Sequence, residues 1–210
     1  QYEASCLDGF LHPGDALELV LVSGVWKAEV AQMERERALV RLVAPLDEER
    51  EPPAPLHCCI PLTAQLSLVD EMLPPLVELG ATLIQPVVYA RSENDAKKGA
   101  SKRDRWLRLI QSAAEQSHRS VLPELRDPLP FEALLRWDAP QKWVAYELAT
   151  GEANPPLAEG PLALTSGPEG GITDDEFAAL QKSGWLPVSL GKSILRAVTA
   201  PTALLGAARF

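Results

Sequence analysis

Two stretches of the sequence combine glycines with charged residues at spacings that suit ligand binding. The first, LTSGPEGGITDDE (164–176), places three glycines and a proline between an apolar run and three consecutive carboxylates. The second, LGKSILRAVTA (190–200), places one glycine and Arg196 after another apolar run. Glycines that follow a strand let the backbone approach a ligand closely. The two stretches are therefore the candidate binding site, and the acids of the first restrict the ligands that fit.

Neither stretch has the spacing of a phosphate-binding motif. A P-loop needs a glycine five residues before the glycine of Gly191-Lys192-Ser193, and that position is Leu186. A dinucleotide fingerprint needs G-x-G-x-x-G, which the GPEGG run does not supply. A generic nucleotide-binding enzyme is therefore the least favoured hypothesis.

The acids of the first stretch also disfavour a phosphate ligand. Thr173 and Glu176 predict a capping box at the start of a helix, and Asp174 and Asp175 would occupy its first turn. A phosphate would meet these carboxylates and Glu169, so the stretch suits a neutral or cationic ligand. A well-capped turn with no ligand role is the simpler interpretation of the helix acids alone.

The pattern of apolar residues predicts two regions of different architecture. Alternating runs at 17–22, 25–31 and 38–44, with Ser23-Gly24 as a hairpin turn, predict a small β barrel. The acidic, proline-rich run 45–55 predicts a linker or exposed loop near the domain boundary.

Beyond the linker, predicted strands alternate with predicted helices. Strands are expected at 56–62, 82–88, 143–148, 161–166 and 186–190, and helices at 65–79, 102–118, 131–136, 174–183 and after Leu195. Such alternation indicates a largely parallel sheet covered on both faces. Ligands of such sheets bind at the carboxyl ends of the strands, where both glycine stretches lie.

The charge distribution is uneven. The formal net charge is −9, but residues 91–119 hold eight basic and four acidic side chains and so carry +4, which leaves −13 for the rest. A local basic surface on an acidic protein can still contact a phosphate backbone, because screening weakens the effect of distant charges. A solvated helix face explains the same charges equally well.

Cysteine usage and hydropathy give no sign of a metal or a membrane. The three cysteines, Cys6, Cys58 and Cys59, lack metal-ligand spacing, and the run LHCCIPL is typical of a buried strand. The chain has neither an apolar run long enough for a membrane span nor the order of a signal peptide. We therefore expect a cytoplasmic protein without a metal site.

The two glycine stretches together resemble a known signature. GPEGG followed by an acidic helix, then LG-x-x-ILR-x-x-TA, is similar to the carboxyl-terminal part of the ribosomal RNA small subunit methyltransferase E family. Similar runs occur in the middle of the chain, at VELGA (77–81), IQP (84–86) and 113–125, and in the pairs Arg91-Ser92 and Arg105-Trp106. The amino-terminal run GDALELV (14–20) resembles the family's small barrel.

The resemblance implies a fold, a cofactor and a substrate. Members of this family belong to the SPOUT class and methylate N3 of a uracil in 16S rRNA. The implied fold is an α/β domain with a trefoil knot at residues 63–210, preceded by a PUA-like β-barrel RNA-binding domain at 1–62 that is expected to be incomplete at its amino terminus. The implied partners are S-adenosylmethionine (SAM), 16S rRNA or the small ribosomal subunit, and a second copy of the chain. The cofactor is cationic at its reactive end and lacks phosphate, so the acids near the first stretch are no obstacle.

The resemblance also assigns site residues. The implied cofactor-binding residues are Leu164, Thr165, Gly167, Glu169, Gly170, Leu190, Gly191, Ile194, Leu195 and Arg196. Arg196 is the catalytic candidate, because its charge could stabilise a uracil oxygen. None of the three histidines matches a motif of the family, and the base is unassigned.

The expected RNA-binding residues lie in the basic segment. They are Arg91, Lys97, Lys98, Lys102, Arg105, Gln116 and Arg119, and such side chains would mainly position phosphates. Pairing with nearby acids such as Glu115 is the alternative for Arg105 and Arg119.

The sequence departs from the family pattern at several positions. Val198 stands in place of a glutamate, Val69 and Pro75 in place of lysines, and Pro201 falls at the start of the final helix. Two alternatives therefore stay open: a catalytically weakened RNA-binding protein of the same fold, or a SPOUT methyltransferase that acts on another RNA such as tRNA.

Overall fold

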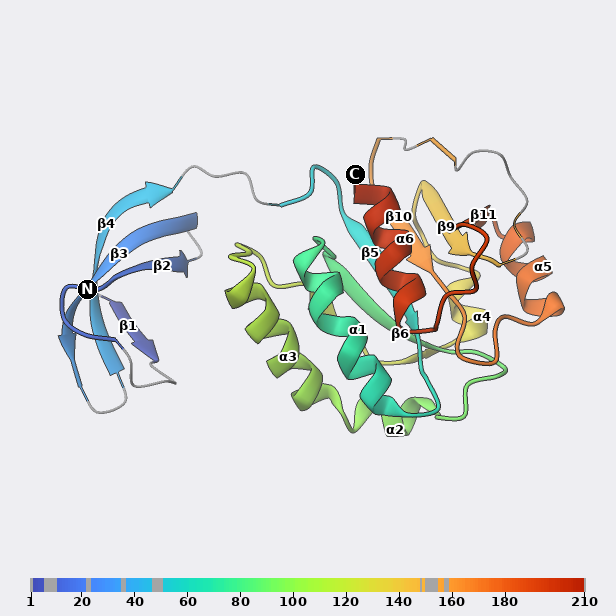
Figure 1. Ribbon diagram of the computed structural model, residues 1–210, viewed down its shortest axis with the longest axis horizontal. Helices are drawn as coiled ribbons and strands as arrows, with labels where there is room; N and C mark the ends of the chain where they lie inside the picture. The colour runs from blue at the N-terminus through green and yellow to red at the C-terminus, as the bar shows by residue number, and fades with distance from the viewer. Residues whose placement is uncertain are drawn as a thin grey trace. The chain divides into compact units, whose positions relative to one another are not determined.

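The computed structural model describes residues 2–5, 11–21, 24–34, 37–46, 51–147, 149, 155–156 and 159–209 (Figure 1). Contacts divide the chain into two compact units, Gln1–Arg50 and Glu51–Phe210. This division comes earlier in the chain than the expected boundary at 62/63. The difference arises because the strand at 56–61 pairs with strands of the second unit.

The first unit is an antiparallel sheet of four strands. They are β1 (Tyr2–Ser5), β2 (Ala16–Leu21), β3 (Gly24–Met33) and β4 (Arg37–Leu46), in the order β1-β4-β3-β2. The three strands expected from alternation are confirmed, and β1 is additional. Ala28, Val30, Ala38 and Val40 form a small buried cluster on β3 and β4. Gly24 begins β3 with φ +115°, a conformation that favours glycine, whereas the rest of the expected turn lies outside the described residues.

The second unit is built on a seven-stranded sheet whose pairings are all parallel. The order is β11-β9-β10-β5-β6-β7, and β8 also pairs with β6. The strands are β5 (Leu56–Pro61), β6 (Leu83–Val88), β7 (Glu124–Leu125), β8 (Leu129–Pro130), β9 (Gln141–Ala145), β10 (Leu162–Thr165) and β11 (Leu186–Val188). The parallel α/β sheet expected from the sequence is confirmed.

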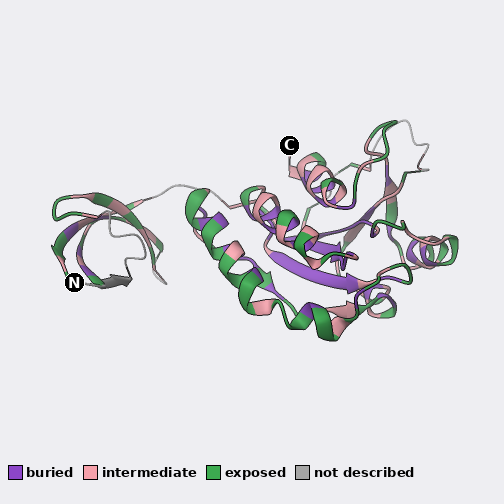
Figure 2. Ribbon diagram, turned by 60° about the horizontal axis from the view of Figure 1, so that its bottom comes forward, coloured by how far each residue is buried: buried purple, intermediate pink, exposed green. Residues whose placement is uncertain are grey.

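Helices cover both faces of this sheet. They are α1 (Leu66–Glu78), α2 (Ala96–Ala100), α3 (Arg103–Gln116), α4 (Phe131–Leu134), α5 (Asp174–Lys182) and α6 (Thr199–Arg209). Side chains of α1, α3 and α6 form one apolar cluster with the sheet, and those of α4 and α5 form a second. Figure 2 shows the strands as the buried layer between the helices.

The β5 strand shows how the sheet divides the two clusters. Cys58 and Ile60 belong to the first cluster and Cys59 to the second, because successive side chains of a strand point to opposite faces. Both thiols are buried, and burial raises the pKa of Cys58 to about 12. These cysteines therefore pack as small apolar residues, as expected; Cys6 lies outside the described residues.

The final helix accommodates its proline. Pro201 is the third residue of α6 and is buried. In the first turn its missing N–H would have no partner within the helix, so proline costs no hydrogen bond there. The sequence departure at Pro201 is thus compatible with a regular helix.

Candidate functional site

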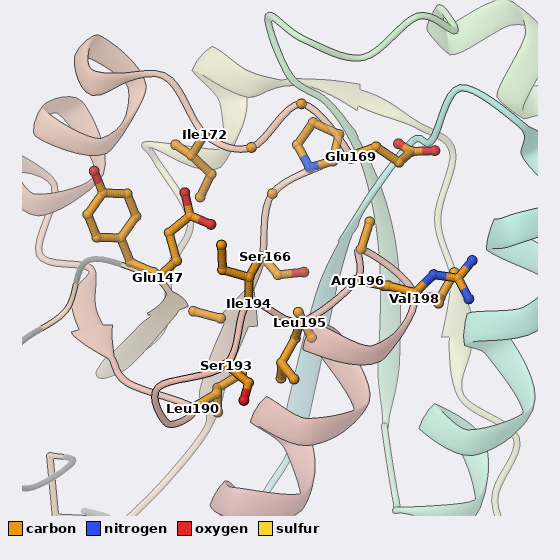
Figure 3. Close-up of a pocket in the computed structure, with 18 of the residues that line it drawn as sticks. Glu147, Ser166, Glu169, Ile172, Leu190, Ser193, Ile194, Leu195, Arg196 and Val198 are labelled. Atoms are coloured by element: carbon orange, nitrogen blue, oxygen red, sulfur yellow. The ribbon is translucent and has the colours of Figure 1, made fainter.

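A pocket of about 420 Å³ lies at the carboxyl ends of β9, β10 and β11 (Figure 3). Three chain segments form most of it: the end of β9 at 145–147, the glycine loop at 166–172 and the second loop at 190–198. Leu68 and Ala200 complete the lining. β9 pairs with both β10 and β11, so parallel pairing alone brings these three strand ends together.

The shape of the glycine loop depends on its glycines. A Cβ atom on Gly167 would lie 2.8 Å from Ile172 Cγ1 and 3.0 Å from the Ile172 nitrogen, so no side chain fits there without a shift. Gly171 has φ +74°, and its N–H donates to the Pro168 carbonyl at 2.8 Å. The loop is therefore a tight turn that presents backbone groups to the pocket.

The capping box predicted at the start of α5 is confirmed. The Thr173 side chain accepts from the Glu176 N–H, and the Glu176 carboxylate accepts from the Thr173 N–H at 2.9 Å. Glu176 is buried and also accepts from the Ala90 N–H at 2.7 Å. Asp174 and Asp175 are exposed and do not line the pocket. The helix terminus is therefore occupied by the protein's own carboxylate, and the acids of the lining are Glu147 and Glu169.

The second loop contributes the cation of the pocket. Gly191 has φ +101°, and Ile194 is 81% exposed. Arg196 is exposed and its carbonyl accepts from the N–H groups of Thr199 and Ala200, which fixes its backbone at the start of α6. Within the described chain its guanidinium has no hydrogen bond or ion pair. In the view of Figure 3, Arg196 and Glu169 lie on the side of the pocket away from Glu147.

The family of RNA methyltransferase domains matches residues 50–209 of this chain. A ribosomal RNA small subunit methyltransferase E from Bacillus subtilis is 32% identical over 194 residues, which cover 86% of this chain and 75% of that protein. The chain belongs to the ribosomal RNA small subunit methyltransferase E family.

Two further relatives agree. The enzyme of the same name from Synechocystis is 37% identical over 190 residues, which make up 87% of this chain but only 61% of that protein. The crystal structure of ribosomal RNA small subunit methyltransferase E from Neisseria gonorrhoeae, bound to S-adenosyl methionine, has a TM-score of 0.83 and 28% identity. That similarity covers 94% of this chain and 83% of the gonococcal chain. The family resemblance inferred from the sequence is thus confirmed.

Most of the expected cofactor-binding residues of this chain meet in the pocket. Eight of them line it: Gly167, Glu169, Gly170, Leu190, Gly191, Ile194, Leu195 and Arg196. Leu164 and Thr165 instead lie buried in β10. The Thr165 hydroxyl bonds to the Cys59 carbonyl at 2.8 Å and to the Tyr89 hydroxyl at 2.6 Å. These two residues therefore lie inside the strand and do not line the pocket.

Residues at the end of β9 were missed by the sequence analysis. The strand expected at 143–148 ends at Ala145, so Tyr146 and Glu147 leave the sheet and line the pocket. The Tyr146 ring stacks on Phe177 with centroids 3.6 Å apart and planes 9° from parallel. The aromatic and acidic residues that end the run WVAYEL were the available signal, but a continuous strand pattern concealed the change.

Ser166 was also missed. It is 1% exposed, lines the pocket, and its hydroxyl has no hydrogen-bond partner within the described part of the chain. A buried hydroxyl without a partner is costly unless a ligand or water supplies one. Ser166 is therefore a candidate ligand contact.

Five of the seven expected RNA-binding residues lie on α2, on α3 or between them, and they fall into two groups. Lys97, Lys98, Lys102 and Gln116 are exposed on α2, on α3 and between them. Arg105 is half exposed, but its Nε donates to Asp70 Oδ2 at 2.7 Å. The side chains of the first group are free to meet a phosphate backbone, whereas Arg105 must leave an ion pair to do so.

Arg119 does not fit the expected RNA-binding role. Its side chain is 4% exposed, and its guanidinium is paired with the Glu51 carboxylate. Its Nη1 donates to the carbonyl oxygens of Val77 and Ala81, at 2.9 and 2.7 Å. The prediction for Arg119 is wrong because this arginine is a buried support for the end of α1. The alternative partner Glu115 was also wrong, because the acid is Glu51.

One departure from the family pattern also becomes interpretable. Val69 is fully buried in the cluster formed by α1, α3 and α6. A lysine at this position would place an ammonium group in an apolar core, which is costly. Val69 therefore packs, and no RNA contact arises from this position.

Within the described ranges, no group of three or more His, Cys, Asp or Glu side chains is arranged to hold a metal ion. Of the helices that the structure describes, none has the length and apolar character to cross a membrane.

Proposed function

We propose that this protein transfers a methyl group from SAM to N3 of a uridine in 16S rRNA. The observation that carries the proposal is the pocket between the glycine loop and the second loop in a member of this methyltransferase family. A relative of the same fold carries SAM. SAM-dependent methylation is therefore the activity that the site supports best.

The pocket chemistry fits this cofactor. Its volume of about 420 Å³ lies within the usual range for small-molecule sites. Backbone groups of the two loops can recognise an adenosine, the Ser166 hydroxyl needs a partner, and Glu147 and Glu169 supply negative charge near a cationic ligand. When bound, SAM supplies an activated methyl group.

Arg196 is the residue proposed to act on the uridine. Removal of the N3 proton leaves negative charge on the uracil oxygens, and a guanidinium at the pocket can stabilise it. The Arg196 guanidinium is exposed and free of protein partners within the described chain, so it can meet the base directly. Holding the uracil in line with the methyl donor lowers the barrier further, and the N3 proton passes to a general base that the described residues do not identify.

The finer features of the fold are part of the same proposal. The parallel sheet and the second loop before α6 support a SPOUT-class trefoil knot, and the homodimer is proposed from the family resemblance alone. The antiparallel unit at 1–50 supports a PUA-like RNA-binding barrel. A ribosomal substrate makes the cytoplasm the expected compartment.

The decisive test is a calorimetric titration with SAM and with its demethylated product, followed by methyl transfer to small ribosomal subunits lacking the modification. Saturable binding near one site per chain and transfer to a uridine N3 are expected. A protein that binds neither compound would refute the proposal.

A weakened relative is the second candidate, and Val198 is the observation that favours it. This residue lines the pocket where the family pattern has glutamate, and its side chain packs against the apolar core. The same titration separates the two, since SAM binding without transfer to any small-subunit particle would favour a non-catalytic RNA-binding role. Transfer to tRNA alone would favour a different RNA substrate.

We predict that Ser166→Ala weakens SAM binding about fivefold, because the ligand loses a hydrogen bond of roughly 1 kcal/mol. The same change should leave the melting temperature of the free protein unchanged or slightly higher, since it removes a buried hydroxyl that lacks a partner. Calorimetry and thermal unfolding measure the two effects. Unchanged SAM affinity would show that the hydroxyl does not contact the cofactor.

RNA binding should weaken steeply with salt. If Lys97, Lys98 and Lys102 each neutralise one phosphate, affinity for single-stranded RNA should fall roughly twentyfold between about 50 and 200 mM salt. Replacing all three lysines with glutamine should flatten this dependence, which a filter-binding series would measure. Equal salt dependence in the triple variant would exclude these lysines from the RNA surface.

A further inference from the structure

The segment at 89–95 follows β6 and makes hydrogen bonds to the chain before and after the glycine loop. The Tyr89 hydroxyl bonds to Thr165 Oγ1 at 2.6 Å, one residue before the loop begins. The Ala90 N–H donates at 2.7 Å to the carboxylate of Glu176, in the first turn of the helix that follows the loop. Two hydrogen bonds from one short segment therefore hold the chain on either side of the loop.

Arg91 lies against the middle of the loop. Its Nη1 donates to the Gly170 carbonyl at 2.6 Å. A Cβ atom on Gly170 would lie 3.0 Å from Arg91 Cβ and 3.2 Å from Arg91 Cδ, so the hydrocarbon part of Arg91 covers this glycine. Both the guanidinium and the methylene groups of Arg91 thus contact the loop.

Asn94 holds the neighbouring residue of the loop indirectly. Its Nδ2 donates to the carbonyl oxygens of Thr63 and Ala64, at 2.6 and 2.7 Å, and Asn94 is buried. The Ala64 N–H in turn donates to the Glu169 carboxylate at 3.1 Å. Glu169 is therefore fixed by the turn between β5 and α1, which Asn94 supports.

We infer that Arg91 is a positioning residue of the cofactor loop rather than an RNA contact, and that Asn94 supports the same loop through Ala64. The inference rests on the proposed function for the identity of the ligand, SAM. A loop held in one shape before binding loses less conformational freedom when the ligand arrives, which increases affinity. Without Arg91, the middle of the loop loses its hydrogen bond and its cover.

The test compares Arg91→Met with Arg108→Met in the 210-residue chain. Arg108 is an exposed arginine of α3 whose Nε donates to the Asp104 carbonyl of its own helix. Both variants lose one guanidinium, but only the first loses a contact with the glycine loop.

Two readouts are expected to separate the variants. In the ligand-free protein, hydrogen exchange of peptides spanning 166–173 should become faster in Arg91→Met and stay unchanged in Arg108→Met. The SAM dissociation constant should rise about tenfold in Arg91→Met, which is about 1.4 kcal/mol. Arg91→Lys should recover part of both effects, because an ammonium can still donate to the Gly170 carbonyl.

The exchange measurement decides the role of Arg91 even if SAM is not the ligand. Absence of SAM binding in the unmodified protein would refute the proposed function, while faster local exchange in Arg91→Met would still support the positioning role. Unchanged loop exchange, with weaker RNA binding, would overturn the inference and return Arg91 to the RNA surface. Faster exchange in β5 and α1 as well would also overturn it, by showing a general loss of stability.

Discussion

Replacing Arg196 with alanine is expected to abolish methyl transfer, with a loss of roughly 100- to 1000-fold in turnover, and to leave the fold intact. The size is that observed when one preorganised group that stabilises developing negative charge is removed. The fold should tolerate the change because the Arg196 side chain is exposed and, within the described chain, makes no hydrogen bond or ion pair. Single-turnover methylation of small subunits measures the loss, and thermal unfolding measures stability.

Lys192→Ala is the matched control for Arg196. Lys192 is an exposed cation of the same loop, but it does not line the pocket. Its loss should leave turnover near normal. An Arg196→Ala protein with near-normal turnover would refute the catalytic assignment, and equal losses in both variants would indicate a general charge effect.

Replacing Glu51 with alanine is expected to lower the free energy of unfolding by about 3–5 kcal/mol, because it leaves the buried Arg119 charge unpaired. The Glu51 carboxylate also accepts from the Ser120 N–H at 3.0 Å and from the Val121 N–H at 3.1 Å, so several donors lose their partner together. Urea denaturation of the full-length chain measures the change.

An exposed ion pair provides the control for Glu51. The Glu124 carboxylate accepts from Arg126 Nε at 2.9 Å, with both side chains about half exposed to solvent. Glu124→Ala should change stability little, because exposed pairs contribute little. Similar losses in Glu51→Ala and Glu124→Ala would contradict the buried role assigned to Arg119.

The ion pair between Glu51 and Arg119 also predicts that the stability of the protein depends on pH. Burial alone would raise the pKa of Glu51, but the hydrogen bonds and charge of Arg119, with the bonds from Ser120, lower the pKa below its ordinary value of 4.5. Because the folded-state pKa is the lower one, the stabilisation is fully present above pH 4.5 and is lost as the pH falls through the folded-state pKa. Glu51→Gln should therefore show a smaller decrease in stability below pH 4.5 than the unmodified protein. Parallel curves for the two proteins would exclude this contribution.

Local sequence patterns determined most of the secondary structure and the place of the site. The alternation of apolar residues correctly predicted β2, β3 and β4, and the largely apolar run LHCCIPL correctly predicted β5. The capping box of Thr173 and Glu176 followed from two residues three apart. Because parallel strands end at one edge of a sheet, the two glycine stretches were expected to meet, and they do.

Only the tertiary structure decided which charged side chains are free to contact a ligand or RNA and which are already paired within the protein. Arg119 and Glu51 are 68 positions apart, and Arg91 and Gly170 are 79 apart, so neither pairing is encoded in a local pattern. A local run of basic residues gives the same sequence signal whether a member faces solvent, as Lys97 does, or is buried in an ion pair, as Arg119 is.

The wall formed by the end of β9 was decided in the same way. The end of β9 at Ala145 places Tyr146 and Glu147 beside the pocket, and packing against α5 fixes the Tyr146 ring. The sequence determined most of the elements, the family and the two loops, because these depend on residues near one another in the chain; β1, β7, β8 and α2 were not expected. The other features depend on contacts that exist only once distant segments have packed together. They are the pocket wall at the end of β9, the buried hydroxyl of Ser166, and the roles of Arg91 and Arg119.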